Sequence, residues 1–365
     1  MEKSFYVPIV KSKDGEFTAL SKLDSFTKSH IFPLIEITPL EFDHESNQKP
    51  KSLEEHLYNF CEKRFLKKWA TKDCMIDTFH IGAELVNGLS AFEYVYQKIV
   101  SEVVIPVVPI PVARLKMSTV AISGLQKVIK QHKIKELAIR VRLADVMLPT
   151  LASDIENLLI QFGMIAENCH VVYDLADANY EEMENFVEPV LYTIESFPFL
   201  KRWKSFTLTG GAFPASHVLK KGETTVLRND WKFYQKIVNQ IKKTEYYRPI
   251  NYGDYGVVHP GYFEFNPKTM STSANIRYAI DGAWFVIKGS KVSKANGNAQ
   301  YKDQAKEISK KEFFFGEEFS SGDQYLKHCG LGRLSPGRAT TWNWVGNNHH
   351  FTLVVKDLFA NSVVA

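Results

Sequence analysis

Charged side chains follow several short apolar runs of this sequence, at the points where buried strands are expected to end. Four of them are carboxylates: Glu36, Asp77, Asp174 and Asp254. Carboxylates can hydrogen-bond the hydroxyl groups of a ligand, bind divalent cations, or act as general acids and bases. The four are therefore candidate catalytic residues, and Glu36 with Asp77 is the candidate pair for a Mg²⁺ ion.

Cations occupy other strand ends in the same pattern: Lys11, Lys13, Arg140 and Arg142. Arginine binds phosphate or carboxylate through its planar fork, so these four are candidate ligand-binding residues. Both signs of charge together predict a nucleotide, a sugar phosphate or a phosphodiester as the ligand. Arg140 and Arg142 share a strand face because strand side chains alternate. The alternative is that one of them forms a salt bridge with Asp174 or Glu36.

These residues must be positioned by alternating strands and helices. Eight apolar runs have the pattern of strands buried on both faces, and all but the last are clearly followed by a helix-like segment. They cover residues 5–10, 31–37, 74–77, 103–110, 137–143, 170–174, 205–209 and 249–252. The pattern predicts a (β/α)8 TIM-barrel-like α/β fold over residues 1–258, with its site at the C-terminal rim. A doubly wound open sheet is the alternative, but residues 11–16 lack the glycine-rich turn which that fold needs.

The remaining residues, 259–365, have a different texture and predict a mixed strand and loop cap packed on the barrel. Residues 276–279, 283–287 and 351–355 are strand-like. If this tail closes the mouth of the barrel, Arg277 is expected to approach Asp254; the alternative is a surface pair with Asp281. His349 and His350 would face opposite sides of a strand, so they are not expected to bind one metal together.

Composition narrows the class of protein. The 365 residues are 45% hydrophobic and 24% charged, which are values of a globular protein. The net charge of +4 is only a mild positive excess, whereas nucleic-acid-binding proteins usually cluster lysine and arginine far more densely. The four cysteines form no zinc-binding pattern, and no apolar run is long enough to span a membrane. We expect a cytoplasmic protein with no membrane segment. P-loop, HExxH and GxSxG motifs are absent.

Several blocks of the sequence resemble the "beta protein" family of tailed phages and bacteria. They are residues 6–16 (YVPIVKSKDGE), 32–37 (FPLIEI), 52–56 (SLEEH), 75–77 (MID), 251–255 (NYGDY), 276–278 (IRY) and 348–350 (NHH), with Trp342. The resemblance implies a link to phages or to defence loci, and it implies no particular reaction. Its matched positions add Tyr255, Arg277 and His350 to the candidate ligand-binding residues.

Two functional hypotheses follow. In the first, the rim binds a phosphorylated small molecule, most simply a nucleotide, or a nucleic-acid end, and hydrolyses the phosphoester with the help of a metal. In the second, the barrel is a non-catalytic binding or regulatory subunit in phage–host conflict. The second hypothesis is motivated by aromatic residues of the tail, because aromatic residues are enriched at protein interfaces. These residues are Trp284, Phe285, Phe313, Phe314, Phe315, Trp342 and Trp344. Sealing of the barrel is the other explanation for these aromatics.

Overall fold

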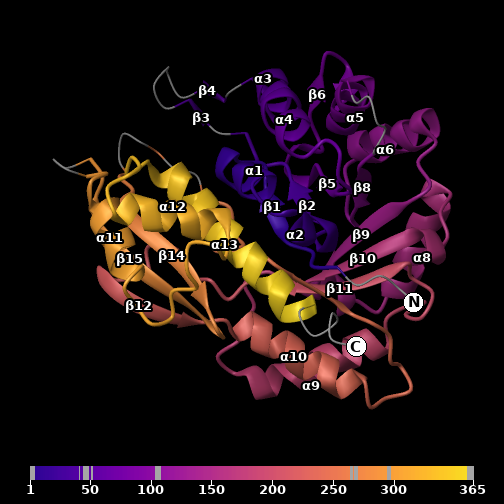
Figure 1. The fold of residues 1–365 in the computed structure, drawn as a ribbon. Coiled ribbons are helices and arrows are strands. Elements are labelled where there is room, and N and C mark those ends of the chain that lie inside the picture. Colours follow the sequence, from indigo (N-terminus) through magenta and orange to yellow (C-terminus); the bar gives the residue numbers. More distant parts are fainter. Residues whose placement is uncertain are drawn as a thin grey trace.

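The computed structural model describes residues 5–40, 42–43, 49–50, 52–102, 108–263, 266, 270–293 and 297–359. Its main sheet has eight parallel strands, arranged in the order in which they occur in the chain (Figure 1). They are β1 (Ile9–Lys11), β2 (Leu34–Glu36), β5 (Met75–Asp77), β8 (Ile110–Ala113), β9 (Leu137–Arg142), β10 (Cys169–Asp174), β11 (Ser205–Gly210) and β13 (Asn251–Asp254). A parallel bridge between Tyr6 and Tyr252 brings the last strand back to the first. The predicted (β/α)8 TIM-barrel-like fold is therefore confirmed.

Helices cover the outside of this barrel. They are α1 (Asp14–Ser21), α2 (Ser25–His30), α3 (Leu53–Tyr58), a π-helical segment (Asn59–Phe65), α4 (Leu66–Lys68), α5 (Ala91–Glu102), α6 (Thr119–His132), α7 (Leu143–Val146), α8 (Leu151–Phe162), α9 (Met183–Glu195) and α10 (Asn229–Ile241). The sequence of α8 shows why such a segment is helical. Leu151, Ile155 and Leu158 recur at helical spacing and are buried, and the helix ends at Gly163, whose positive φ of 63° suits glycine.

Two strand expectations need correction. The fourth strand was expected at residues 103–110, but β8 begins at Ile110, and residues 103–107 lie outside the described residues. Pro109 supplies no backbone donor, and β8 begins at the next residue. The strand expected at residues 351–355 is wrong, because these residues belong to the 21-residue helix α13 (Ala339–Phe359).

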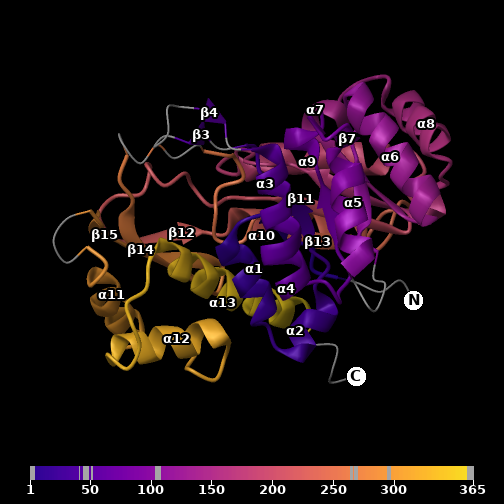
Figure 2. The ribbon, with the colours of Figure 1, turned by 90° about the horizontal axis from the view of Figure 1, so that it is seen from above.

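A three-stranded antiparallel sheet lies beside the barrel, in the order β12 (Gly222–Leu227), β15 (Ala283–Lys291) and β14 (Ser273–Ile280). Helices α11 (Gln300–Ile308) and α12 (Ser321–Gly330) accompany it, on the opposite side of the molecule from α6 and α8 (Figure 2). Short two-stranded pairs complete the fold: β3 (Phe42–Asp43) with β4 (Lys49–Pro50), and β6 (Leu85–Val86) with β7 (Leu89–Ser90).

Helix α13 joins the small sheet to the barrel. It packs against α1 and α2 on the barrel side and against β14 and α12 on the other, and Figure 1 shows it lying between these parts. The tail aromatics help to fill this junction, since Trp284, Trp342 and Trp344 are all at most 9% exposed. Sealing of the barrel is thus the explanation that fits these tryptophans.

Candidate functional site

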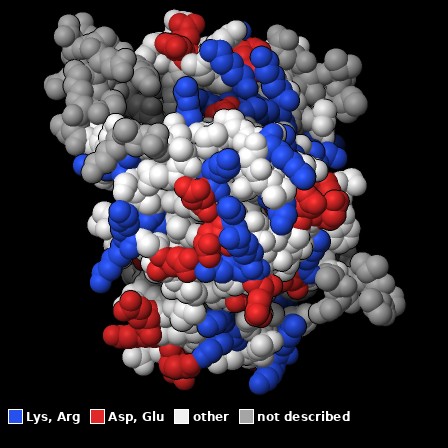
Figure 3. Space-filling model, turned by 60° about the vertical axis from the view of Figure 1, so that its left-hand side comes forward, with Lys and Arg blue, Asp and Glu red and all other residues white. Residues whose placement is uncertain are grey.

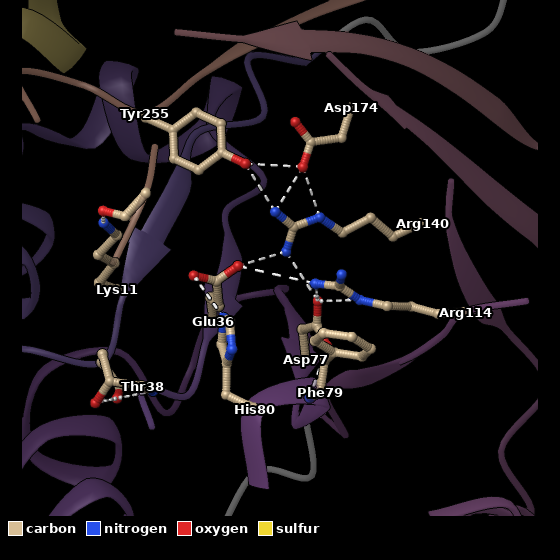
Figure 4. A network of polar contacts seen from close by, with 12 residues as sticks. Lys11, Glu36, Thr38, Asp77, Phe79, His80, Arg114, Arg140, Asp174 and Tyr255 are labelled. Carbon is tan, nitrogen blue, oxygen red and sulfur yellow. Dashed lines mark hydrogen bonds and ion pairs between the residues drawn. The ribbon is translucent and has the colours of Figure 1, made fainter. Parts of the chain in front are cut away.

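A polar layer lies directly above the apolar filling of the barrel. The inner cluster contains Ile9, Leu34, Met75, Val112, Ala138 and Val172, one residue from each of six strands. Side chains alternate along a strand, so the residue two positions further also faces inward. These residues are Lys11, Glu36, Asp77, Arg114, Arg140 and Asp174, and Figure 4 shows them gathered at the carboxyl ends of the strands. This is the end at which TIM barrels carry their sites.

Arg140 is the centre of this layer, and its side chain is fully buried. Its Nη1 atom donates to Glu36 and to Asp77, at 2.8 Å each. Its Nε and Nη2 atoms donate to Oδ2 of Asp174 at 2.9 and 2.6 Å, and Nη2 also donates to the Tyr255 hydroxyl at 2.8 Å. One guanidinium therefore binds three carboxylates from three strands. The sequence analysis gave as an alternative that Arg140 or Arg142 forms a salt bridge with Asp174 or Glu36. Arg140 forms salt bridges with both carboxylates.

Two further guanidinium groups flank the centre. Arg114 donates to Oδ2 of Asp77 through Nε at 3.2 Å and through Nη2 at 2.6 Å. Arg142 lies 3.1 Å from Oδ2 of Asp174 through Nη1, and its side chain is 33% exposed. Tyr255 donates its hydroxyl to the same Asp174 oxygen at 2.8 Å. The structure thus brings together two candidate ligand-binding residues, Arg142 and Tyr255, at the mouth, with Arg114, which the sequence analysis did not include.

These cations set the charge state of the carboxylates. Burial by itself would raise the pKa of Glu36, but Arg140 and the neighbouring His80 hold it well below its usual range. Burial also opposes ionisation of Asp77, yet Arg114 and Arg140 lower the pKa of that carboxyl. Burial would lower the pKa of Arg140, and its contacts with Tyr255 and the carboxylates raise it instead. Glu36, Asp77 and Arg140 are thus ionised and neutralise one another.

The residues predicted for Mg²⁺ do not fit a metal site. The Nη1 atom of Arg140 lies between Glu36 and Asp77 and is within 2.8 Å of both, where a shared metal ion would have to sit. The second oxygen of Asp77 accepts the backbone N–H of Phe79 at 3.0 Å. Within the described ranges, no group of three or more His, Cys, Asp or Glu residues could hold a metal ion. We therefore derive no metal chemistry from this pair.

The two lysines contact the chain that follows β13. Lys11 donates from Nζ to the carbonyl oxygens of His259 and Gly261, at 3.0 and 2.8 Å. Burial lowers the pKa of Lys11, and the attraction of Glu36 opposes that shift. The ammonium group of Lys13 lies 5.3 Å from the ring centroid of Tyr262. Lys11 therefore holds residues 259–261 at the mouth, a role that the sequence analysis did not predict.

Asp254 is not part of the inward-facing layer. Its neighbour Tyr255 belongs to the inner cluster, so alternation turns Asp254 to the outside of the barrel. There its carboxylate accepts from the Tyr6 hydroxyl at 2.5 Å, from His350 at 2.7 Å and from the Gly256 N–H at 2.8 Å. The expectation that all four carboxylates share one site is wrong for this residue. His350 accordingly lies outside the mouth as well.

Arg277 does not bind Asp254 as expected. It donates through Nη1 to the carbonyl oxygen of Val257 at 2.7 Å, and its guanidinium lies 5.0 Å from the ring centroid of Phe213. Burial lowers its pKa to about 10, and the charge of Glu16 opposes this shift. The alternative pair with Asp281 is not formed either. The Nη1 atom reaches a backbone carbonyl because β14 runs beside the segment that follows β13, while the buried Nε atom has no hydrogen-bond partner in the described structure.

Sequence reasoning missed Arg114 and the aromatic residue next to it. Arg114 was overlooked because the fourth strand was placed too early, so that residues 112–114 were not recognised as its end. The guanidinium of Arg114 lies 4.0 Å from the ring centroid of Phe79, which is 48% exposed. His80 lies beside them, with Nε2 3.4 Å from Glu36. The inward alternation Val112, Arg114 is the signal that could have revealed this residue.

Comparison with known proteins supports a family assignment. A family model described as "Beta protein" matches residues 6–356. A search of curated protein sequences gave no match. Among solved structures, the chain is similar to a chitinase from Chromobacterium violaceum ATCC 12472, with 10% identity, coverage of 94% of this chain and 98% of that chain, and a TM-score of 0.32.

A second similar structure is the spore cortex-lytic enzyme SleL of Bacillus cereus, with 8% identity, coverage of 94% of this chain and 74% of that chain, and a TM-score of 0.30. No helix in the described part of the chain is long and apolar enough to cross a membrane. The family match extends over nearly the whole sequence and includes every strand of the barrel. On that basis the chain belongs to the Beta protein family.

Proposed function

We propose that the mouth of the barrel binds a phosphorylated ligand. The observation that carries this proposal is which atoms of the Arg142 guanidinium group make contacts within the protein. In the part of the chain that the structure describes, its side-chain contacts with Asp174 and Tyr255 both use Nη1. The Nε and Nη2 atoms remain for a ligand, and a planar N–H pair of this kind suits the bidentate binding of a phosphate.

The charge balance of the mouth also favours an anion. The guanidinium groups of Arg114, Arg140 and Arg142 neutralise the three inward-facing carboxylates, to which they are bonded. Lys11 and Lys13 then outnumber Glu16, the buried carboxylate that interacts with both, and leave the region positive. A ligand that is itself a cation would meet carboxylates whose oxygens already accept hydrogen bonds. A phosphate, by contrast, gains charge-assisted hydrogen bonds without displacing any pair.

A compact ligand fits better than a long nucleic acid. Binding to a duplex uses an extended basic surface that contacts many phosphates. On the face shown in Figure 3, basic and acidic side chains are interspersed and no broad basic patch is present. The net charge of the chain is only +4. A nucleotide, a sugar phosphate or the end of a nucleic acid would use the mouth alone.

Binding is better supported than metal-assisted hydrolysis. A general acid or base works best when its pKa is near the working pH, and the pKa values of Glu36 and Asp77 are both lowered. We therefore propose that Glu36, Asp77 and Asp174, expected to be catalytic, instead position the arginines. These positioning roles favour the second hypothesis, in which the barrel is a non-catalytic binding or regulatory subunit. Its place in phage–host conflict stays a prediction from the family resemblance.

Ligand-induced stabilisation of the whole chain tests the proposal. Pyrophosphate and the common nucleotides would be titrated with the protein in EDTA and in Mg²⁺, with thermal unfolding and calorimetry as the measurements. A ligand at about 100 times its Kd should add about 2.7 kcal/mol to the free energy of unfolding. Stabilisation in EDTA is the expected result, because the site needs no metal.

The matched variants are Arg142→Ala and Arg202→Ala. Arg202 also forms an exposed ion pair, with Glu167, but it precedes β11 at the opposite end of the barrel. Losing a charge-assisted hydrogen bond should weaken binding roughly 10-fold or more in Arg142→Ala and leave Arg202→Ala unchanged. Absence of any phosphate-dependent shift at millimolar concentration, or equal binding by the two variants, would contradict the proposal.

A further inference from the structure

A cavity of about 220 Å³ opens beside the mouth, between the ends of β5 and β8 and the start of α6. Its apolar wall contains Phe92, Val112, Met117 and Ala121, and its polar edge contains Asp77 and Arg114. A mostly apolar wall with a few polar groups at one edge is typical of a small-molecule site.

Phe79 makes this cavity suitable for a flat ring. Its side chain lines the cavity and is 48% exposed, although it is a large apolar group. The Arg114 guanidinium packs 4.0 Å from its ring centroid, so the aromatic and cationic groups are held together. Both aromatic faces and guanidinium planes stack on nucleic-acid bases. Arg114 is the member of the polar layer that packs on this ring.

The cavity and the mouth share a wall. Asp77 lines the cavity, and its Oδ2 atom accepts from both Arg114 and Arg140. A ligand with a ring in the cavity would therefore extend directly over the arginine layer. A nucleotide has this arrangement, with a flat base at one end, a sugar, and a phosphate at the other.

We infer that the cavity binds a nucleobase, so that the phosphorylated ligand of the mouth is a nucleotide or a terminal nucleotide. This inference rests on the proposed function for the phosphate end, but it makes a separate claim about the ring. A sugar phosphate without a base would occupy only the arginine side of the site. The two ends of the ligand can therefore be tested independently.

The experiment compares three probes on the full-length chain by calorimetry: the ribonucleoside 5′-monophosphates, ribose 5-phosphate, and the nucleosides. At least one nucleotide should bind roughly 10-fold or more tightly than ribose 5-phosphate, as stacking of one base implies. The base that gives the largest gain identifies the preferred nucleotide.

Ala83→Phe supplies the matched variant, because Ala83 lines the cavity and is exposed, so that a larger side chain there fills the cavity rather than the core. It should remove the advantage of the nucleotide and leave the affinity for ribose 5-phosphate unchanged. Ala152→Phe, an exposed position on α8 away from this cavity, is the control and should bind like the parent.

The outcomes separate the two proposals. Equal binding of nucleotide and ribose 5-phosphate by the parent would overturn the nucleobase cavity and leave the phosphate site standing. Failure of both phosphates to bind would contradict the proposed function, and the nucleosides then decide about the cavity. If nucleosides bind the parent and Ala83→Phe abolishes that binding, the assignment of the cavity to a nucleobase stands. If no nucleoside binds, that assignment is overturned.

Discussion

The Nε2 atom of His350 lies 2.7 Å from Oδ2 of Asp254, in a contact that joins α13 to the outer face of β13 across 96 positions of sequence. Both side chains are completely buried. The other ring nitrogen of His350, Nδ1, has no hydrogen-bond partner in the described structure. A neutral ring that donates from Nε2 leaves only a bare acceptor at Nδ1. An imidazolium would leave a buried N–H without an acceptor, which is more costly.

Acidification is predicted to weaken the fold through His350. Burial lowers the pKa of His350 despite the attraction of Asp254, so the folded protein holds this proton less tightly than the unfolded chain does. The resulting stability is present above the ordinary histidine pKa of about 6.5 and is lost as the pH falls below it. Guanidinium chloride unfolding at pH 8 and pH 5.5 measures the effect. His350→Gln, which keeps a donor for Asp254, should lose less stability between these pH values than the parent; an equal loss would contradict the prediction.

Asp230 should contribute a pH dependence of stability with the opposite sign. Burial and the nearby Asp254 raise its pKa to about 7, and Arg228 only partly offsets this. An acid with a raised pKa in the folded state costs stability as the pH rises from about 4 to 7, and the cost persists above. At about 1.4 kcal/mol per pKa unit, Asp230→Asn should gain up to about 4 kcal/mol at pH 8.

The gain from Asp230→Asn should shrink at pH 5, where the parent carboxyl is already protonated. Denaturant unfolding of parent and variant at the two pH values provides the measurement. Asp281→Asn, at an exposed position, serves as the control for removing one negative charge. A gain of the same size at both pH values would show that burial of the Asp230 charge is not its cause.

Arg140 is predicted to be irreplaceable in the mouth. Arg140→Met removes the cation that Glu36, Asp77 and Asp174 share. Arg114 and Arg142 still contact Asp77 and Asp174, but buried Glu36 loses its guanidinium hydrogen bond, and removing one partner of a buried ion pair costs roughly 3–5 kcal/mol. Arg140→Lys should recover little of this loss, because a single ammonium lacks the planar fork that reaches carboxylates on separate strands. Unfolding free energies measure both variants. A lysine variant as stable as the parent would mean that charge alone, not geometry, holds the layer together.

The barrel was predictable from the sequence because its strands are short apolar runs, as expected for strands covered on both sides. The rim followed from it, since alternation and parallel pairing bring the ends of β2, β5 and β10 together. The position of a residue at the end of a strand does not show whether its side chain faces into the barrel or out of it, so this could not be predicted. Asp254 and Tyr255 are adjacent, so only one of them could face inward, and the structure turns Tyr255 to the mouth.

The tail was less predictable for a physical reason. Helix α13 is buried from Trp344 to Val355 on every side, so it has no polar face to mark a helical period. Its run of Phe351, Thr352, Leu353, Val354 and Val355 is rich in β-branched residues and therefore resembles a strand. Tertiary packing against α1 and β14 determines the helix, and that packing is not visible in local sequence.

We predict that Lys11 holds residues 259–261 in place at the mouth and does not bind the phosphate of a ligand. Two protons of its ammonium group bind the carbonyl oxygens of His259 and Gly261, and Phe263, just beyond, is 65% exposed. Lys11→Met keeps the unbranched chain as far as Cε and removes both bonds, so chymotrypsin should cleave after Phe263 several-fold faster. Lys13→Met is the control, because Lys13 only lies over the Tyr262 ring at 5.3 Å. If both variants are cleaved at the parental rate under native conditions, the bonds from Lys11 do not hold this segment at the mouth, and its ammonium group becomes available to the ligand.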